Sequence, residues 1–222
     1  MSTARRKSMK TTLITGTSTG IGKAIAELFL ESGYRVIGLD LLESSITHSN
    51  YTHHICDIRE TLPAITEPLN IVVNNAGTDV RENALATNLQ AAFRIEDAYV
   101  SQNTECVVNI GSTSAHLGIE SREYSASKAG LLGYTRQLAK TMATWGGRAV
   151  SVSPGPVVTD MNSAILADSQ KRAAVAEQNL LNKWIEPQEI AQAVLFMCNA
   201  SSVTGVDLLI DCGEHINHTE IM

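Results

Sequence analysis

Tyr124 and Lys128 stand four residues apart and form the first pair in this sequence whose side chains could do chemistry together. At this spacing on a helix, two side chains lie on one face, about one turn apart. A free phenol has a pKa of about 10, so it is a poor acid or base near neutral pH. A neighbouring ammonium stabilises the phenolate and lowers that pKa toward the working range. The spacing therefore indicates an acid/base pair, although a half-buried tyrosine beside an unrelated surface lysine gives the same pattern.

The composition of the chain favours one globular α/β domain around this pair. Its 222 residues are 44% hydrophobic with a mean hydropathy near zero, which argues against disorder. A net charge of −6 argues against a general nucleic-acid binder, and no apolar run reaches membrane-spanning length. We therefore expect a cytoplasmic protein with no nucleic-acid or membrane partner.

The N-terminal residues and the cysteines of the chain show no pattern of a targeting signal or a metal site. Residues 1–10 are basic and polar and lack the apolar stretch of a signal peptide, so we expect a disordered leader or an expression remnant before a domain at 11–222. The cysteines lack CxxC spacing, which favours buried free thiols over disulfides or a metal site. We expect no metal.

A glycine-rich turn, Gly16-Thr17-Ser18-Thr19-Gly20-Ile21-Gly22, separates a strand expected at 11–15 from an amphipathic helix expected to end at Ser32-Gly33. The spacing G-x-x-x-G-x-G differs from the common G-x-G-x-x-G, but its glycines serve the same ends. One permits a tight turn, one lets a pyrophosphate approach the backbone, and one lets the helix pack on the sheet. The turn therefore predicts a dinucleotide at the helix N-terminus, and a loop that uses glycine only as punctuation is the alternative.

Asp40 ends the next expected strand, 34–39, and lies 18 positions after Gly22. A carboxylate at this place can accept both hydroxyls of an adenosine ribose and repels a 2′-phosphate. Neither the glycine turn nor residues 41–42 supply an Arg or Lys for that phosphate. The sequence therefore favours NAD over NADP, with an N-cap or turn aspartate as the alternative.

The rest of the chain continues the alternation of strands and helices. Further strands are expected at 53–56, 71–73, 106–110, 148–152 and 206–210, and helices at 83–101, from Tyr124 to about Thr144, and from Glu186. The 83–101 helix should turn five apolar residues to the core: Leu85, Leu89, Ala92, Phe93 and Ala98. Residues 57–70 are too short and proline-broken for a long helix, and 160–179 reads as a mobile helical segment. Seven strands alternating with helices predict a single-domain Rossmann fold, a doubly wound parallel sheet with helices on both faces and a ligand crevice at the carboxyl ends of its strands.

Taken in order, these stretches resemble the short-chain dehydrogenase/reductase family over nearly the whole chain. The motifs that carry the resemblance are Thr15-Gly16-x-x-x-Gly20-x-Gly22, Asp57, Asn74-Asn75-Ala76-Gly77, Asn88, Ser112, Tyr124-x-x-x-Lys128, Pro154-Gly155 with Thr159, and Thr204-Gly205 before Asp211-Cys212-Gly213. The resemblance implies an NAD(H)-dependent oxidoreductase that interconverts a secondary alcohol and a ketone. A dinucleotide-sensing or scaffold protein on the same fold, without catalysis, is the alternative.

The resemblance implies four catalytic residues. Tyr124 gives its proton to a carbonyl or takes one from an alcohol, while Lys128 lowers the pKa of Tyr124 and binds the nicotinamide ribose. Ser112 hydrogen-bonds the substrate oxygen, with Ser114 as a nearby competitor. Asn88 holds a water that links Lys128 to solvent, unless it is only a helix-packing amide.

The resemblance also implies where the cofactor lies. Ser18 and Ile21 approach the pyrophosphate, Asp57-Ile58 meets the adenine, and backbone at Val157 binds the carboxamide. The full set of expected cofactor-binding residues is Gly16, Ser18, Thr19, Gly20, Ile21, Gly22, Asp40, Leu41, Asp57, Ile58, Asn75, Ala76, Gly77, Tyr124, Lys128, Pro154, Gly155, Val157 and Thr159.

The chain also departs from the family pattern. Only ten residues separate Gly77 from Asn88, and 57–70 is short as well, so the geometry of the homo-oligomer that we expect, a dimer or tetramer, stays open. Cys212 stands where the family commonly has glycine. The substrate should be a small-molecule alcohol or ketone in contact with 116–119, the segment after Pro156 and 160–184, in a moderately apolar pocket. Candidates for its wall are Met161, Ile165, Leu166, Leu180 and Trp184, although each can equally pack on the core.

Overall fold

Seven parallel strands form one sheet in the order β3-β2-β1-β4-β5-β6-β7 in the computed structural model, which describes residues 9–217. The strands are β1 Thr11–Thr15, β2 Arg35–Asp40, β3 Tyr51–Ile55, β4 Ile71–Asn74, β5 Cys106–Ile110, β6 Arg148–Pro154 and β7 Asp207–Ile210. The chain builds outward from β1 to β3 and then crosses back to β4, so the strand order reverses between β1 and β4. This confirms the predicted doubly wound sheet. The expected leader at 1–10 lies almost wholly outside the described residues.

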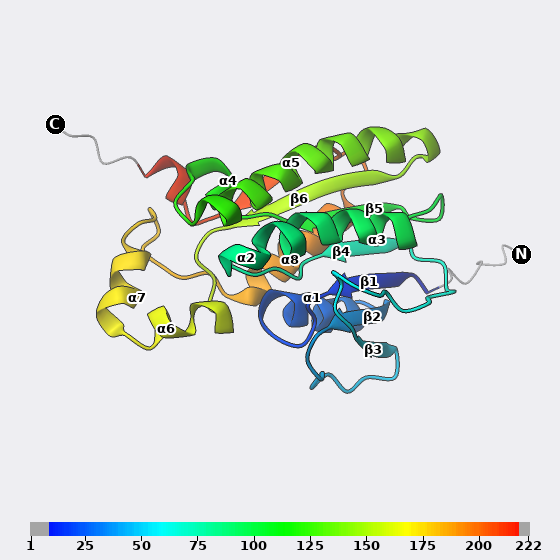
Figure 1. Ribbon diagram of the computed structural model, residues 1–222, viewed down its shortest axis with the longest axis horizontal. Helices are drawn as coiled ribbons and strands as arrows, with labels where there is room; N and C mark the ends of the chain where they lie inside the picture. The colour runs from blue at the N-terminus through cyan, green and yellow to red at the C-terminus, as the bar shows by residue number, and fades with distance from the viewer. Residues whose placement is uncertain (1–8, 218–222) are drawn as a thin grey trace, which may run out of the picture.

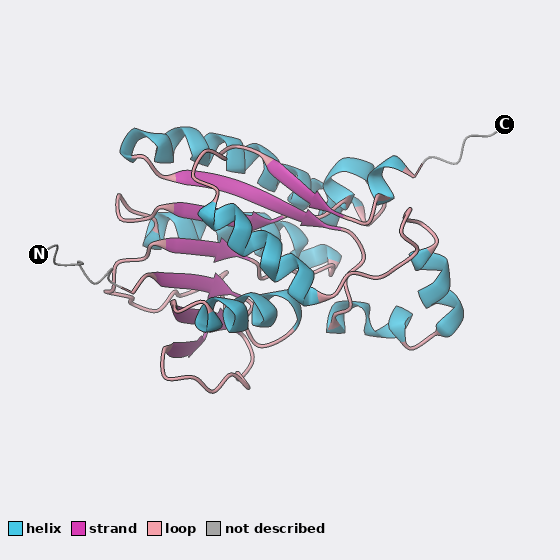
Figure 2. Ribbon diagram, turned by 180° about the vertical axis from the view of Figure 1, so that it is seen from behind, coloured by secondary structure: helices cyan, strands magenta, loops and turns pink. Residues whose placement is uncertain are grey.

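Helices cover both faces of the sheet. Helices α3 (Ala91–Tyr99) and α5 (Arg122–Met142) lie in front of it in Figure 1, and α1 (Gly20–Glu31) and α8 (Pro187–Asn199) cover the opposite face in Figure 2. Each face has its own apolar core, with Phe29 and Ile190 buried on one side and Ile95 and Leu138 on the other. Both cores pack against β-branched strand residues that are almost completely buried, as a parallel sheet requires.

Shorter helices complete the chain, mostly beyond the carboxyl ends of the strands. They are α2 Arg81–Leu85, a π-helical turn Ala86–Gln90, α4 Ser114–Leu117, α6 Ser163–Leu166, α7 Ser169–Ala176, and 3₁₀ turns at Ala143–Trp145, Asp160–Asn162 and Glu214–Ile216. In Figure 1 α6 and α7 stand out from the body at the end where α4 also lies. The segment expected to be helical at 160–179 is therefore three short helical pieces, joined by turns. Within residues 9–217, no helix is long and apolar enough to cross a membrane.

The core face expected for the 83–101 helix was wrong. The structure buries Ala84, Asn88, Ala91, Ala92 and Ile95, so only Ala92 matches. Leu85 and Phe93 are 44% and 40% exposed, Leu89 is half-buried and Ala98 is exposed. The buried face is shifted by one residue, and the shift is already present at Ala84, before the π-helical turn begins at Ala86. The neighbouring face also carries apolar residues at helical spacing, Ala84, Ala91 and Ile95, and packing in the fold selects that face. Phe93 packs instead edge-on against the Tyr134 ring, with 4.8 Å between centroids.

Local signals fix several element ends. Gly33 follows α1 with φ +82, a conformation that glycine adopts at little cost. Glu186 and Glu189 form a capping box at the start of α8, where Pro187 occupies the first turn. Cys212 has φ +55, the left-handed conformation that favours glycine. The described chain has free cysteines only, of which Cys106 is fully buried and the others partly.

Candidate active site

A cavity of about 470 Å³ lies at the carboxyl ends of the strands, where the sheet order reverses. Ser112 and most of the residues expected to bind a cofactor line its wall: Gly16, Thr19, Gly20, Ile21, Asp40, Leu41, Asp57, Ile58, Asn75, Ala76, Gly77, Tyr124, Lys128, Pro154, Gly155, Val157 and Thr159. Three of the expected site residues, Ser18, Gly22 and Asn88, do not line it. The tertiary fold thus brings residues from most of the chain to one crevice.

The glycine turn leaves room for a ligand at the N-terminus of α1. A Cβ on Gly22 would lie 1.9 Å from the Gly16 carbonyl oxygen, so only glycine allows this close approach of helix and turn. Asn75 holds the turn from the next strand, because its Nδ2 donates to the carbonyls of Thr15 and Gly16 at 2.9 and 3.2 Å. No side chain caps the start of α1, so its first backbone N–H groups are free to meet a phosphate. The turn therefore fits the pyrophosphate of a dinucleotide.

Asp40 is held rigidly beside this turn. Its carboxylate accepts the backbone N–H of Ser18 at 2.9 Å and that of Leu42 at 3.0 Å. Ser18 is buried, and its hydroxyl donates to the Leu42 carbonyl rather than pointing into the cavity. In this structure Ser18 therefore orients Asp40, and its contact with a pyrophosphate stays a prediction.

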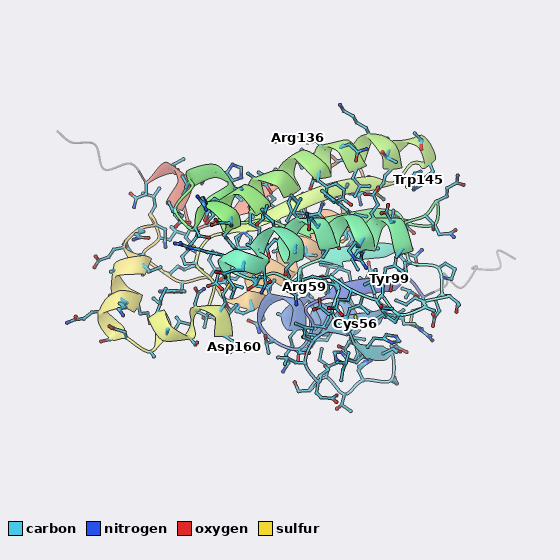
Figure 3. All side chains as sticks on the ribbon, in the orientation of Figure 1. Cys56, Arg59, Tyr99, Arg136, Trp145 and Asp160 are labelled. Atoms are coloured by element: carbon cyan, nitrogen blue, oxygen red, sulfur yellow. The ribbon has the colours of Figure 1, made fainter. Side chains whose placement is uncertain are left out.

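Sequence reasoning missed Arg59. Its guanidinium makes a bidentate contact with the Asp57 carboxylate, in which Nε donates to Oδ1 at 2.9 Å and Nη2 donates to Oδ2 at 2.6 Å. This contact lowers the pKa of Asp57. Arg59 and the neighbouring Cys56 both line the cavity (Figure 3). The signal was the Asp-x-Arg spacing, which is common at turns and therefore weak. Other lining residues that were not expected are Leu39, Thr78, Asn83, Thr87, Ile110 and Gly111, while Asp160 and Asn162 belong to the segment expected to contact the substrate.

Tyr124 lies at the first turn of α5, where Ser121 caps the helix by accepting the Tyr124 N–H at 3.3 Å. Ser112 follows β5 and lines the same cavity wall. Burial raises the pKa of Tyr124 above the ordinary value, and Ser112 opposes that rise only in part. The expected lowering of this pKa by Lys128 is not seen in this structure, because Lys128 is not among the groups that shift it.

Lys128 lies one turn further along α5 and is 4% exposed. Its Nζ donates to the Ile110 carbonyl at 2.8 Å and stands 5.8 Å from the centre of the Tyr124 ring. Burial disfavours the charged ammonium and lowers the pKa of Lys128 to about 8. Tyr124, Ser112 and Lys128 thus line one wall of the cavity together, as a phenol, a hydroxyl and a buried amine.

Asn88 lies in the π-helical turn, outside the main cavity. Its Oδ1 accepts the Thr78 N–H at 2.8 Å, and its Nδ2 donates to the Thr78 carbonyl and to Ser127 Oγ at 2.9 and 3.0 Å. These bonds fix the loop after β4 to helix α5. Asn88 also lines a second cavity of about 10 Å³, which Lys128 shares.

Most residues expected at the substrate end do not reach the cavity. Among the five apolar candidates only Met161 lines it, and Trp184 is buried with its Nε1 bonded to the Arg172 carbonyl at 2.9 Å. His116 pairs through Nε2 with Asp207 at 2.7 Å, a carboxylate that also accepts Ser151 and Ser153. His116 therefore joins α4 to β7 rather than lining the cavity.

The comparisons with known proteins agree with this fold and site. The family model described as Enoyl-(Acyl carrier protein) reductase matches residues 50–215. The 3-oxoacyl-[acyl-carrier-protein] reductase FabG of Vibrio cholerae is 33% identical, over 93% of this chain and 98% of its own. Carbonyl reductase family member 4 of Xenopus tropicalis is 32% identical, over 92% and 97%.

Solved structures also resemble this fold over most of its length. A short chain dehydrogenase/reductase family oxidoreductase from Burkholderia thailandensis has a TM-score of 0.86 at 27% identity, over 94% of this chain and 93% of its own. A 4-hydroxyisoleucine dehydrogenase complexed with NADH has a TM-score of 0.82 at 25% identity, over 92% and 98%. Fold and site together define a Rossmann-fold oxidoreductase. The chain belongs to the short-chain dehydrogenase/reductase family.

Proposed function

We propose that this protein is an NAD(H)-dependent oxidoreductase that interconverts a secondary alcohol and a ketone. The observation that carries the proposal is the group of Tyr124, Ser112 and Lys128 on the wall of the cavity that also contains the glycine turn. An acid/base phenol and a dinucleotide site that share one crevice are what hydride transfer to a carbonyl requires.

The chain's own residues would handle the proton. In reduction, Tyr124 gives its phenol proton to the carbonyl oxygen as negative charge develops there, and in oxidation it takes that proton back. Ser112 hydrogen-bonds the same oxygen and so orients the substrate. The Lys128 ammonium, in a site of low dielectric, stabilises the phenolate form of Tyr124. When bound, the nicotinamide cofactor supplies or accepts the hydride.

The preference for NAD over NADP rests on Asp40. Its carboxylate lines the cavity and is oriented by Ser18 and Leu42, so a 2′-phosphate would approach a fixed negative charge. A similar dehydrogenase was solved with NADH. Arg59 argues in the other direction, since a cation on the same wall could bind the 2′-phosphate of NADP, but this guanidinium is already paired with the Asp57 carboxylate.

The substrate proposal goes no further than a small alcohol or ketone. Met161 gives the substrate end one apolar wall, and the relatives' names include reductases of 3-oxoacyl groups and a carbonyl reductase. We also propose that the chain acts in the cytoplasm as a homo-oligomer. Light scattering coupled to size-exclusion chromatography tests the oligomer, and a single-chain mass would contradict it.

A turnover panel with the Tyr124→Phe variant tests the proposal. The unmodified protein should oxidise NADH with some of a set of ketones and reduce NAD⁺ with the matching alcohols. Tyr124→Phe removes the proton donor but keeps the ring, so kcat should fall at least about 100-fold, the scale of general acid catalysis. Binding of NADH, followed by fluorescence titration, should change little. Full activity in the variant would refute the proposed role of Tyr124, and no turnover in the unmodified protein would favour a non-catalytic binder.

A further inference from the structure

A row of buried polar side chains crosses strands β4 and β5 to helix α5. Thr135 Oγ1 donates to the Leu131 carbonyl at 2.7 Å, so it accepts the bond from Asn109 Nδ2 at 2.9 Å. Asn109 Oδ1 in turn accepts from Asn74 Nδ2 at 2.8 Å. Each bond fixes the direction of the next, so the amide oxygen of Asn74 must point away from the row.

That oxygen, Asn74 Oδ1, is buried and has no hydrogen-bond partner among the described residues. Asn74 is 9% exposed, and a buried acceptor without a partner costs about 1–3 kcal/mol. Asn74 lines the second cavity, whose volume of about 10 Å³ is close to the space that one water occupies. The site therefore has polar groups on its wall and is about the size of one water molecule.

Donors stand around the same cavity. Lys128 lines it and donates one N–H to the Ile110 carbonyl, so two N–H groups of its ammonium remain as donors. Thr15 lines it as well, and its Oγ1 accepts two backbone N–H groups, so its own hydrogen remains to be donated. A water here could accept from Lys128 and Thr15 and donate to Asn74, which meets the usual number of partners.

Asn88, the residue expected to hold a water beside Lys128, offers less to this cavity. Both hydrogens of its Nδ2 are used on Thr78 and Ser127, and its Oδ1 already accepts the Thr78 N–H. Asn74 is therefore the side chain with an unused acceptor.

We propose that Asn74 is a positioning residue of the active site, which holds one buried water against the Lys128 ammonium. The inference rests on the proposed function, since it concerns the same lysine. The water accepts an N–H of Lys128 and donates to Asn74 Oδ1, so it stabilises the charged form of the amine. An amide does not pass a proton on, so Asn74 anchors the water and takes no part in a proton relay.

The variant Asn74→Leu removes the acceptor and nearly keeps the shape. The matched control is Thr12→Val on the neighbouring strand β1, since Thr12 is fully buried and its Oγ1 also lacks a partner among the described residues, but it lines neither cavity. Tyr124 is the titratable side chain that the described contacts place against Lys128. Loss of a bond to the ammonium makes Lys128 lose its proton at lower pH. In Asn74→Leu the alkaline limb of the kcat–pH profile should therefore move down by about one pH unit, the equivalent of one charged hydrogen bond.

Thr12→Val should leave that limb in place, and both variants should bind NADH as the unmodified protein does. An equal shift in the two variants would reduce Asn74 to a structural residue. A high-resolution crystal structure of the unmodified protein gives a second test that needs no variant to fold and no turnover. It should contain a water within hydrogen-bonding distance of both Asn74 Oδ1 and Lys128 Nζ, and a dry cavity would overturn the inference. Absence of turnover in the unmodified protein would refute the proposed function instead.

Discussion

At the scale of the residue, Asp40 performs two tasks with one carboxylate. It ties the glycine turn to the segment after β2 through Ser18 and Leu42, and it lines the cavity. A substitution by alanine would remove both tasks at once. The amide of asparagine removes the charge and keeps one of the two acceptor oxygens, so it disturbs the turn less than alanine would.

We therefore predict that Asp40→Asn narrows the preference for NADH over NADPH by about tenfold, which corresponds to about 1.4 kcal/mol of removed repulsion. The ratio of kcat/KM for the two cofactors measures this effect. The control is Glu43→Ala, which removes an exposed carboxylate nearby and should leave the ratio unchanged. An unaltered ratio in Asp40→Asn would mean that another residue, with Arg59 first among them, discriminates the cofactors.

At the scale of the element, the turn between β1 and α1 depends on contact distances rather than on flexibility. The Cα of Gly22 packs directly on the Gly16 carbonyl and the Asn75 amide, and this contact sets the start of α1 against the sheet. The same helix N-terminus faces the cavity. Packing and ligand binding therefore share one residue.

Gly22→Ala should destabilise the fold by several kcal/mol or displace α1, and it should weaken NADH binding in parallel, since its Cβ would lie 1.9 Å from a carbonyl oxygen. Thermal unfolding and NADH titration measure the two effects. The matched control is Gly133→Ala inside α5, where an added Cβ meets nothing within 4 Å. That change should stabilise the protein by about 0.5–1 kcal/mol, the usual gain for alanine in a helix. Equal effects at the two glycines would contradict the close-packing argument.

At the scale of the whole molecule, burial of the Lys128 ammonium lowers the stability of the fold. The pKa of Lys128 is lowered to about 8, below the value of about 10.4 in an unfolded chain. For an amine, a lowered folded-state pKa means that the charged form opposes folding. This penalty is fully present below about pH 8 and disappears as pH rises toward the unfolded-state value.

Lys128→Met should therefore raise the free energy of unfolding at pH 7 by about 1–3 kcal/mol and abolish turnover. The gain should shrink between about pH 8 and about pH 10.4, where the unmodified protein sheds the proton on folding. Chemical denaturation at several pH values measures it. The control Lys140→Met changes an exposed lysine of the same helix and should alter stability little at any pH. A destabilised Lys128→Met variant would show that the Ile110 hydrogen bond outweighs the cost of burial.

The sequence by itself determined the order of strands along the chain and the glycine turn, and it predicted the chemistry of the site. Strands and turns follow from short-range patterns, and the Tyr124–Lys128 spacing lies within one helix, so local rules suffice for both. The role of Gly33 at the end of α1 and the capping box before α8 could be predicted on the same ground.

Only the tertiary structure decided which side chains point where. The apolar pattern of residues 83–101 allows two neighbouring faces, and only packing in the fold selected the face that leaves Leu85 and Phe93 exposed. The fold also placed Arg59 on the cavity wall. Ser18 bonds Asp40 and His116 pairs with Asp207, and local rules do not reach these partners because they are distant in sequence. Tyr124 and Lys128 also depend on the tertiary structure. Their spacing is local, but their pKa values depend on burial, and burial is a property of the folded whole.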